Sequence, residues 1–237
     1  MRKFLMMINN FMDRAFGKRI HPSPEARLSS TRNQLIAQFA CNIVIDVGAN
    51  SGQWASRLRK SGYMGQIISY EPSSAFTNLE KKTTKDSFWR AKKVALSDCS
   101  GFTTFFVASN SGLSSSILQP KEILNYHSGI KFKSEIQVPI TRLDSEGIEG
   151  SNIYLKIDTQ GSEFSVLQGS LNLLPHISVI EFESSLAELY EGERSHHSIS
   201  TWLISKGFQP RQIVVTHWDS QLATISIDSI FSRPKQA

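Results

Sequence analysis

Acidic residues recur at the ends of short apolar segments, and their spacing is the first indication of chemistry. Asp46 lies near the end of one such segment, Glu71 ends the next, and Asp98 follows a third. Short segments rich in β-branched residues and closed by turn residues predict buried strands. Ligands of open parallel sheets bind outside the carboxyl ends of the strands, so these three carboxylates are expected to surround one ligand.

The turn after the first segment reads Asp46-Val-Gly48-Ala-Asn50-Ser-Gly52. A dinucleotide site requires Gly-x-Gly-x-x-Gly, because its middle glycine lets the backbone approach a pyrophosphate. Here Asn50 replaces that glycine and Asp46 adds a negative charge. Both features disfavour a diphosphate, and with it the rival function of an NAD-dependent oxidoreductase. They favour a ligand whose amine-bearing end lies against the turn.

The next two strand ends suggest what the rest of this ligand is. Glu71 is placed to accept hydrogen bonds from both hydroxyls of a ribose. Asp98 is suited to accept from an exocyclic amine such as that of adenine. A nucleoside that carries an amino acid satisfies all three positions, and the sequence therefore predicts S-adenosylmethionine. For each carboxylate alone, a helix N-cap or a solvated loop position remains the plain alternative.

Further motifs follow in a fixed order, and together with the first they resemble the FkbM family of methyltransferases over about residues 40–233. The matching segments are Val44-Ile-Asp-Val-Gly-Ala-Asn-Ser-Gly52, Tyr70-Glu-Pro72, Ala95-Leu-Ser-Asp98, Thr141-Arg-Leu-Asp144, Leu155-Lys-Ile-Asp-Thr-Gln-Gly161 with Glu163, and Asp228-x-Ile-Phe231. The resemblance implies methyl transfer, mainly to hydroxyl oxygens of sugars, polyketides or other small molecules. It implies that the cofactor is held by Asp46, Gly48, Asn50, Gly52, Glu71, Ser97 and Asp98.

The resemblance also places Asp158 beside the transferring methyl, and we expect Asp158 and then Glu183 to be catalytic. Lys156 shares a strand face with Asp158 and is expected to be its ion-pair partner. Glu181 and Glu183 end the fifth strand on one side, where carboxylates deprotonate an acceptor or bind a cation. A divalent cation such as Mg²⁺ is left open and not predicted, because the lysine of metal-dependent catechol-type enzymes is missing after Asp158.

Several neighbours have both a structural and a functional interpretation. Gly161 is expected in a tight turn, and Glu163 in the first turn of a helix, where a carboxylate favours the dipole. Four histidines are alternative bases, although each alone is more often a surface residue; they are His127, His196, His197 and His217.

The order of periodic segments predicts how these residues are positioned. Strands and helices alternate, which indicates an α/β fold with parallel strands and right-handed crossovers. Strands are expected at 43–47, 66–70, 91–96, 102–107, 136–141, 153–157, 177–182, 212–215 and 222–227, and helices at 30–39, 53–60, 75–83, 163–173 and 198–206. The last two strands are close enough for an antiparallel hairpin. The family resemblance adds a Rossmann-like, seven-stranded sheet whose last strand is antiparallel, with helices on both faces.

The expected domains are an N-terminal helical extension at 1–39 and a methyltransferase domain at 40–237 with an insertion over the sheet edge at about 100–145. The small-residue loop 109–116 and the stretch 190–197 are expected to cover the site. Residues 2–17 predict an amphipathic basic helix, which packs on its own domain or a second subunit, or lies on a membrane surface.

Composition limits the partners. The chain of 237 residues has a net charge of +5, but its first sixty residues hold ten Lys and Arg against three Asp and Glu. Basicity confined to the front end argues against a nucleic-acid-binding surface across the fold. No apolar run is long enough to span a membrane, and no signal-peptide cleavage site is apparent. With only two cysteines, a cytoplasmic enzyme is expected, acting on a small molecule or glycan. A homo-oligomer and a non-catalytic protein with the same fold remain alternatives.

Overall fold

The computed structural model describes residues 23–122, 129–218 and 224–235. The expected helix at residues 2–17 and His127 lie outside these ranges. Seven strands form the main sheet in the order β3-β2-β1-β7-β8-β10-β9. Parallel pairing joins β1 to β2 and β7, β2 to β3, and β7 to β8, whereas β10 runs antiparallel to both β8 and β9. This is the predicted sheet with its antiparallel last strand.

Three buried strands have the predicted bounds: β1 (Ile43–Val47), β2 (Gln66–Tyr70) and β7 (Ile153–Ile157). Each is a short apolar run that is almost wholly buried, as expected of a strand covered on both faces. The other strands of the main sheet are β3 (Trp89–Lys92), β8 (Ile177–Ser185), β9 (Gln209–Trp218) and β10 (Thr224–Ser232).

Helices cover both faces of the sheet. One apolar cluster joins residues of α2 (Pro24–Gln38), α3 (Gln53–Lys60) and α4 (Phe76–Thr83) to one face. A second cluster joins α6 (Glu163–Gln168) and α7 (His196–Ser205) to the other. Helix α2 begins earlier than predicted, because Pro24 stands at its first position and the Ser23 side chain caps it; both features favour a helix start.

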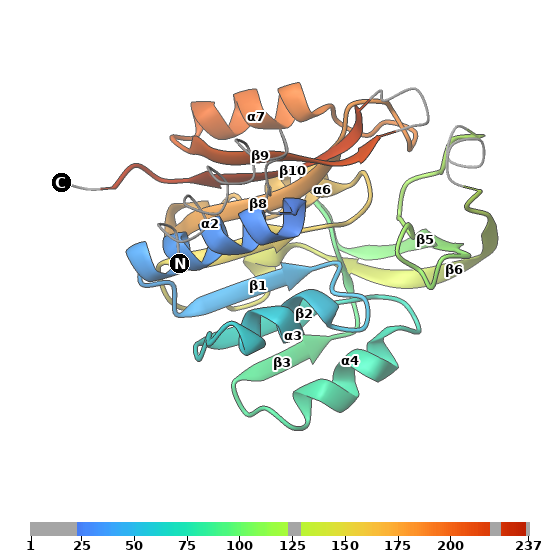
Figure 1. The fold of residues 1–237 in the computed structure, drawn as a ribbon. Helices are drawn as coiled ribbons and strands as arrows, with labels where there is room; N and C mark the ends of the chain where they lie inside the picture. Colours follow the sequence, from blue (N-terminus) through green and yellow to red (C-terminus); the bar gives the residue numbers. More distant parts are fainter. Residues whose placement is uncertain (1–22, 123–128, 219–223, 236–237) are drawn as a thin grey trace, which may run out of the picture.

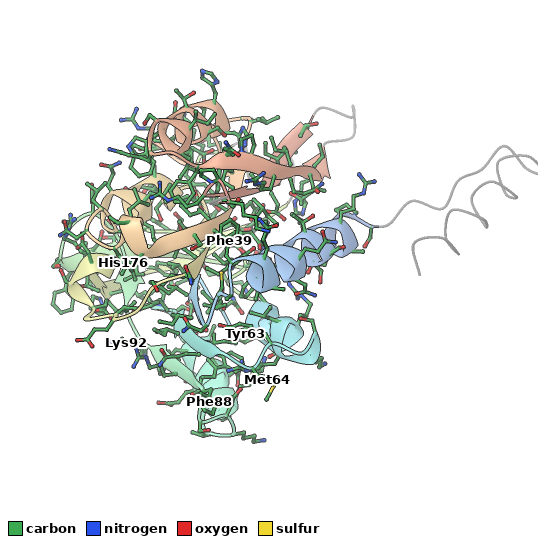
Figure 2. All side chains as sticks on the ribbon, turned by 90° about the vertical axis from the view of Figure 1, so that its left-hand side faces the viewer. Phe39, Tyr63, Met64, Phe88, Lys92 and His176 are labelled. Atoms are coloured by element: carbon green, nitrogen blue, oxygen red, sulfur yellow. The ribbon has the colours of Figure 1, made fainter. Side chains whose placement is uncertain are left out.

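The predicted strand 91–96 is in fact two strands that belong to different sheets. After Lys92 the chain leaves the main sheet, and β4 (Ala95–Leu96) pairs with β6 (Phe132–Thr141), which pairs in turn with β5 (Gly101–Ala108). Figure 1 shows β5 and β6 beyond the tips of the β1 and β2 arrows, at the carboxyl side of the main sheet. The amino side lies opposite, where Phe39, Met64 and His176 precede β1, β2 and β8 (Figure 2).

The predicted helix at 163–173 is also shorter in the structure. Helix α6 ends at Gln168, and a 3-10 turn (Leu174–His176) leads into β8. A Cβ added at Gly169 would lie 1.9 Å from the carbonyl oxygen of Ser97. The close approach of these two backbones explains why a glycine stands here.

Candidate active site

Two cavities open at the carboxyl side of the main sheet and meet at Asp158. The first has a volume of about 370 Å³ and is lined by the turn after β1, the end of β2, and residues of the second sheet. The second, of about 420 Å³, is lined by the ends of β8 and β10 and by the segments around Leu113 and Tyr190. Asp158, Gln160 and Leu113 line both. A ligand in either cavity would therefore lie next to Asp158.

The turn after β1 is shaped by the approach of β7. Gly48 has φ of +74°, and a Cβ added there would lie 1.8 Å from the carbonyl oxygen of Asp158. The Asp158 N–H donates to Val47 O at 3.0 Å. Any side chain at position 48 would push Asp158 out of place, so Gly48 serves the junction of the two strand ends as well as the cavity wall.

Glu71 holds the same turn from the side of β2. One of its carboxylate oxygens accepts from the Asn50 N–H at 2.8 Å, and the other accepts from the Ser73 N–H at 2.9 Å. The side chain is buried at the first cavity. Each carboxylate oxygen keeps a second lone pair for a ligand hydroxyl. Asn50, with φ of +47°, also reaches across the cavity mouth and donates to Ser111 O at 3.2 Å.

The expected cofactor residues divide into two groups. Gly48, Asn50 and Glu71 line the first cavity, together with the predicted catalytic residue Asp158. Asp46, Gly52, Ser97 and Asp98 do not line it. Asp46 is fully buried beneath the turn, and Asp98 is exposed to solvent. The β3–β4 segment instead contributes apolar residues to the wall: Val94, Ala95 and Leu96.

Lys156 forms ion pairs with two acidic residues of the site, Asp46 and Asp158. Its Nζ lies 3.3 Å from Asp46 Oδ1 and 3.2 Å from Asp158 Oδ2, which confirms the expected ion pair and adds a second partner. Burial alone would lower the pKa of Lys156, but the charges of Asp158 and Asp46 outweigh it and raise that pKa. The lysine is therefore a fixed cation that orients Asp158 from behind.

Asp158 and Glu183 are linked through one amide. Gln160 Nε2 donates to Asp158 Oδ1 and to Glu183 Oε2, each at 2.9 Å. Gln160 has φ of +56°, a costly conformation for a residue with a Cβ. The turn is anchored by Glu163, whose carboxylate accepts from the Thr159 N–H at 2.9 Å and the Gly161 N–H at 3.0 Å.

The two bridged carboxyls have opposite pKa shifts. Burial raises the pKa of Asp158, but Lys156 and the hydrogen bond from Gln160 outweigh it, so the pKa lies below its usual value. Burial, and then the negative charges of Asp158 and Asp228, raise the pKa of Glu183 well above its usual value. The surroundings therefore favour the ionised form of Asp158 and the protonated form of Glu183.

Glu181 is not available for chemistry, although it neighbours Glu183 on the same strand. Arg32 of α2 binds it through two nitrogens, at 2.6 and 2.8 Å. Tyr154 donates its hydroxyl to the same carboxylate, and Trp54 Nε1 lies 3.4 Å from it. All of these groups are buried, and Trp54 also lines the first cavity. These contacts form a buried polar row that holds helix α2 against the main sheet. The row consists of Arg32, Glu181, Tyr154 and Trp54.

Histidines and loop contacts complete the second cavity. His217 lines it and its Nδ1 lies 3.1 Å from Ser226 Oγ, whereas His196 and His197 begin α7 and do not line it. Tyr190 donates to Ser114 O at 2.8 Å, which joins the two segments expected to cover the site. Sequence periodicity gave no sign of Tyr190 or Gln160 as site residues; only their neighbourhood to predicted loops and to Asp158 could have suggested them.

Within residues 23–122, 129–218 and 224–235, no group of three or more His, Cys, Asp or Glu side chains is arranged to hold a metal ion. Among the same residues, no helix is long and apolar enough to cross a membrane.

The chain is similar to known methyltransferases in sequence and in structure. The 2-O-methyltransferase NoeI of Sinorhizobium fredii (strain NBRC 101917 / NGR234) is 30% identical over 162 residues, which are 64% of this chain and 66% of that relative. The chain thus spans just under two thirds of it. Among solved structures, the N-methyltransferase NodS from Bradyrhizobium japonicum WM9 is 9% identical with a TM-score of 0.49, covering 88% of this chain and 95% of that one. The magnesium protoporphyrin IX methyltransferase ChlM from Synechocystis PCC 6803 is 9% identical with a TM-score of 0.46, covering 97% of each chain.

The sheet order and the family comparison together confirm the predicted fold and methyltransferase class. Residues 46–210 match the Methyltransferase FkbM domain, which is more than half of the chain. The matched residues begin at Asp46, and every described residue that lines the first cavity lies within them. The chain belongs to the FkbM family of methyltransferases.

Proposed function

We propose that this protein transfers the methyl group of S-adenosylmethionine to a hydroxyl oxygen of a sugar, glycan, polyketide or other small molecule. The observation that carries this proposal is the position of Asp158 at the meeting point of the two cavities. Family membership supports the cofactor, and the relative NoeI, which is named a 2-O-methyltransferase, supports oxygen as the acceptor atom.

The first cavity fits the cofactor in chemistry. It offers the carboxylate of Glu71 for ribose hydroxyls and the apolar side chains of Val94, Leu96 and Phe105 for a base. Asn50 and the backbone of Gly48 are placed to hold the amino-acid end. When bound, S-adenosylmethionine supplies a methyl group on a sulfonium, which is already a good leaving group. Asp46 and Gly52 then support this cavity from below, and binding roles for Ser97 and Asp98 stay as predictions.

The protein's own residues supply alignment and a proton acceptor. Lys156 and Gln160 hold the Asp158 carboxylate in one orientation, and alignment accounts for much of the rate of such a displacement. An alcohol has a very high pKa, so a base acts as the proton leaves rather than before. Asp158, whose ionised form Lys156 favours, accepts that proton, and Glu183, which lines the second cavity, hydrogen-bonds to the acceptor.

The setting of the proposed reaction rests on two further features. Cys41 and Cys99 are free, which supports a reducing compartment such as the cytoplasm. The absence of a suitable donor cluster among residues 23–122, 129–218 and 224–235 gives no support for a divalent cation. We assign the proton transfer to Asp158 because it lies where the two cavities meet.

Titration with S-adenosylmethionine, combined with a labelled-methyl assay over candidate acceptors, tests the proposal. We expect saturable binding at one site and transfer that continues in the presence of a chelator. Binding without transfer to any acceptor would favour a non-catalytic protein. Loss of transfer on chelation with recovery on adding Mg²⁺ would replace the metal-free reaction.

A further inference from the structure

The second cavity holds several acids and, among its described lining residues, no lysine or arginine. Asp158, Glu163 and Glu183 line it. The cation next to them, Lys156, lines only the first cavity and is already held between Asp46 and Asp158. A ligand with its own negative charge would therefore meet three acidic side chains, with His217 as the one basic side chain among the described lining residues.

Uncharged hydrogen-bonding groups also line this cavity. Asn110, Ser185 and Ser226 are among its lining residues, and Ser226 Oγ lies 3.1 Å from His217 Nδ1. Amide and hydroxyl side chains both donate and accept hydrogen bonds, so hydroxyls on a ligand are suitable partners for them.

The remaining lining suits a ring with an apolar face. Leu113, Leu189, Ile225 and the buried Tyr190 line one cavity with the polar residues Asn110, Ser185 and Ser226. Apolar walls with a few convergent polar groups are typical of small-molecule sites. A pyranose-like ring matches this pattern, because it carries C–H groups on its faces and hydroxyls around its edge.

We propose that the second cavity binds the acceptor as an uncharged, hydroxyl-rich ring and rejects rings that carry a carboxylate, phosphate or sulfate. This inference rests on the proposed function, and it narrows the substrate class of the same site. An uncharged hydroxyl can both donate to and accept from the two carboxyl groups of Asp158 and Glu183, which line the cavity. An anionic substituent in this cavity would be repelled by Asp158 and would raise the cost of ionising Glu163.

Matched acceptors test the selectivity directly. The full chain would be assayed with labelled S-adenosylmethionine and three pairs of p-nitrophenyl glycosides: glucose and glucuronic acid, galactose and galacturonic acid, and N-acetylglucosamine and its 6-sulfate. We expect kcat/KM to be at least tenfold higher for the uncharged member of each pair. Equal or higher values for the anionic members would overturn the proposal. So would the absence of transfer to any uncharged glycoside by an enzyme that binds S-adenosylmethionine and methylates other molecules.

The proposed function is tested by a separate readout. Failure to bind S-adenosylmethionine in calorimetry would overturn the proposed methyltransferase, whereas normal binding with anionic acceptors preferred would overturn only the selectivity. The two failures are thus distinguishable.

A cation added to the cavity wall should weaken the selectivity. Ile130 lines the second cavity, and Ile130→Lys is expected to reduce the preference for the uncharged member at least threefold without altering cofactor affinity. Ile213→Lys is the matched control, because Ile213 is 51% exposed on β9 and lines neither cavity. Should Ile130→Lys fail to fold, Ser185→Lys places the charge in the same cavity. A folded cavity variant whose preference equals that of the control would contradict the proposal.

Discussion

The two cavities that meet at Asp158 are built from different kinds of structure. The first cavity, which we propose holds the cofactor and call the cofactor cavity, takes many of its polar residues from strand ends and the turns that follow them, and Glu71 fixes such a turn through backbone hydrogen bonds. The second cavity, which we propose holds the acceptor and call the acceptor cavity, takes polar residues from loops and an edge of the sheet, such as Asn110, Tyr190 and Ser226. Residues set by the backbone of parallel strands suit a cofactor shared by many enzymes, whereas loop and edge-strand residues change easily with the acceptor.

The largest effect is expected at the residue that both cavities share. Asp158→Asn keeps the size and the hydrogen bond from Gln160 but removes the proton acceptor, and turnover should fall on the order of 10²–10⁴-fold. Cofactor affinity should change little, because the cofactor cavity keeps Glu71 and Asn50. Single-turnover methyl transfer and calorimetry measure the two quantities. A folded Asn variant with full activity would remove Asp158 from the role of base.

The buried polar row should matter for stability. Arg32→Met leaves Glu181 buried without its cation, and the free energy of unfolding should fall by about 3–5 kcal/mol. Adding Glu181→Leu should recover much of this loss, because no buried charge is then left unpaired. Urea unfolding followed by circular dichroism measures both variants.

The matched control for Arg32→Met is Arg57→Met. Arg57 is 54% exposed and lies 3.6 Å from Glu25, so its loss should cost less than about 1 kcal/mol. An Arg32→Met variant no less stable than this control would contradict the importance of the buried pair.

Variants of Glu71 and Asp98 test which of these two acidic residues binds the cofactor. Glu71→Ala should weaken S-adenosylmethionine binding by roughly 1–3 kcal/mol, the scale of a lost charge-assisted hydrogen bond. The sequence assigns Asp98 to the adenine, whereas its exposed position outside the cavity predicts almost no loss of affinity for Asp98→Ala. Calorimetry on both variants decides between the two expectations. A loss of similar size in both would place the adenine nearer to Asp98 than the cavity suggests.

The sequence correctly predicted features that depend on residues close together in the chain. The bounds of β1, β2 and β7 followed from apolar runs, and Lys156 was paired with Asp158 because strand residues two apart share a face. It failed at residues 91–96, where pairing with β6 draws Ala95–Leu96 into another sheet. It also could not assign Glu181 to Arg32, since that contact joins residues 149 positions apart. Long-range pairing of this kind leaves no local signal.

A smaller effect concerns the turn that carries Gln160 into the junction. Burial raises the pKa of Glu163 to about 7 from an ordinary value of 4.5. The folded protein therefore binds this proton more tightly than the unfolded chain, so stability should fall as pH rises from 4.5 to 7. Glu163→Gln should flatten that slope, which urea unfolding at several pH values would show. The exposed Glu149→Gln is the control; a slope unchanged in both variants would contradict the shift.

The smallest expected effect is in the segments that cover the two cavities. Asn50 donates to Ser111 O, Ser116 donates to Gln160 O at 2.7 Å, and Tyr190 donates to Ser114 O, so the loop 109–116 contacts both the cofactor turn and the acceptor wall. Closure of such a loop would exclude water from the reacting groups.

The structure separates the predicted covering stretch 190–197 into two parts. Residues 190–193 belong with the cover, whereas His196 lies within α7 and stacks on Phe182 at 5.8 Å between ring centroids. We expect S-adenosylhomocysteine plus an acceptor to slow hydrogen exchange several-fold in 109–116 and 190–193 and to leave α7 unchanged. Exchange that is equal with and without ligands in these two segments would rule out a moving cover. Slower exchange with S-adenosylhomocysteine alone would show that cofactor binding is enough to close these segments. A further slowing that requires the acceptor would show that closure depends on ligands in both cavities.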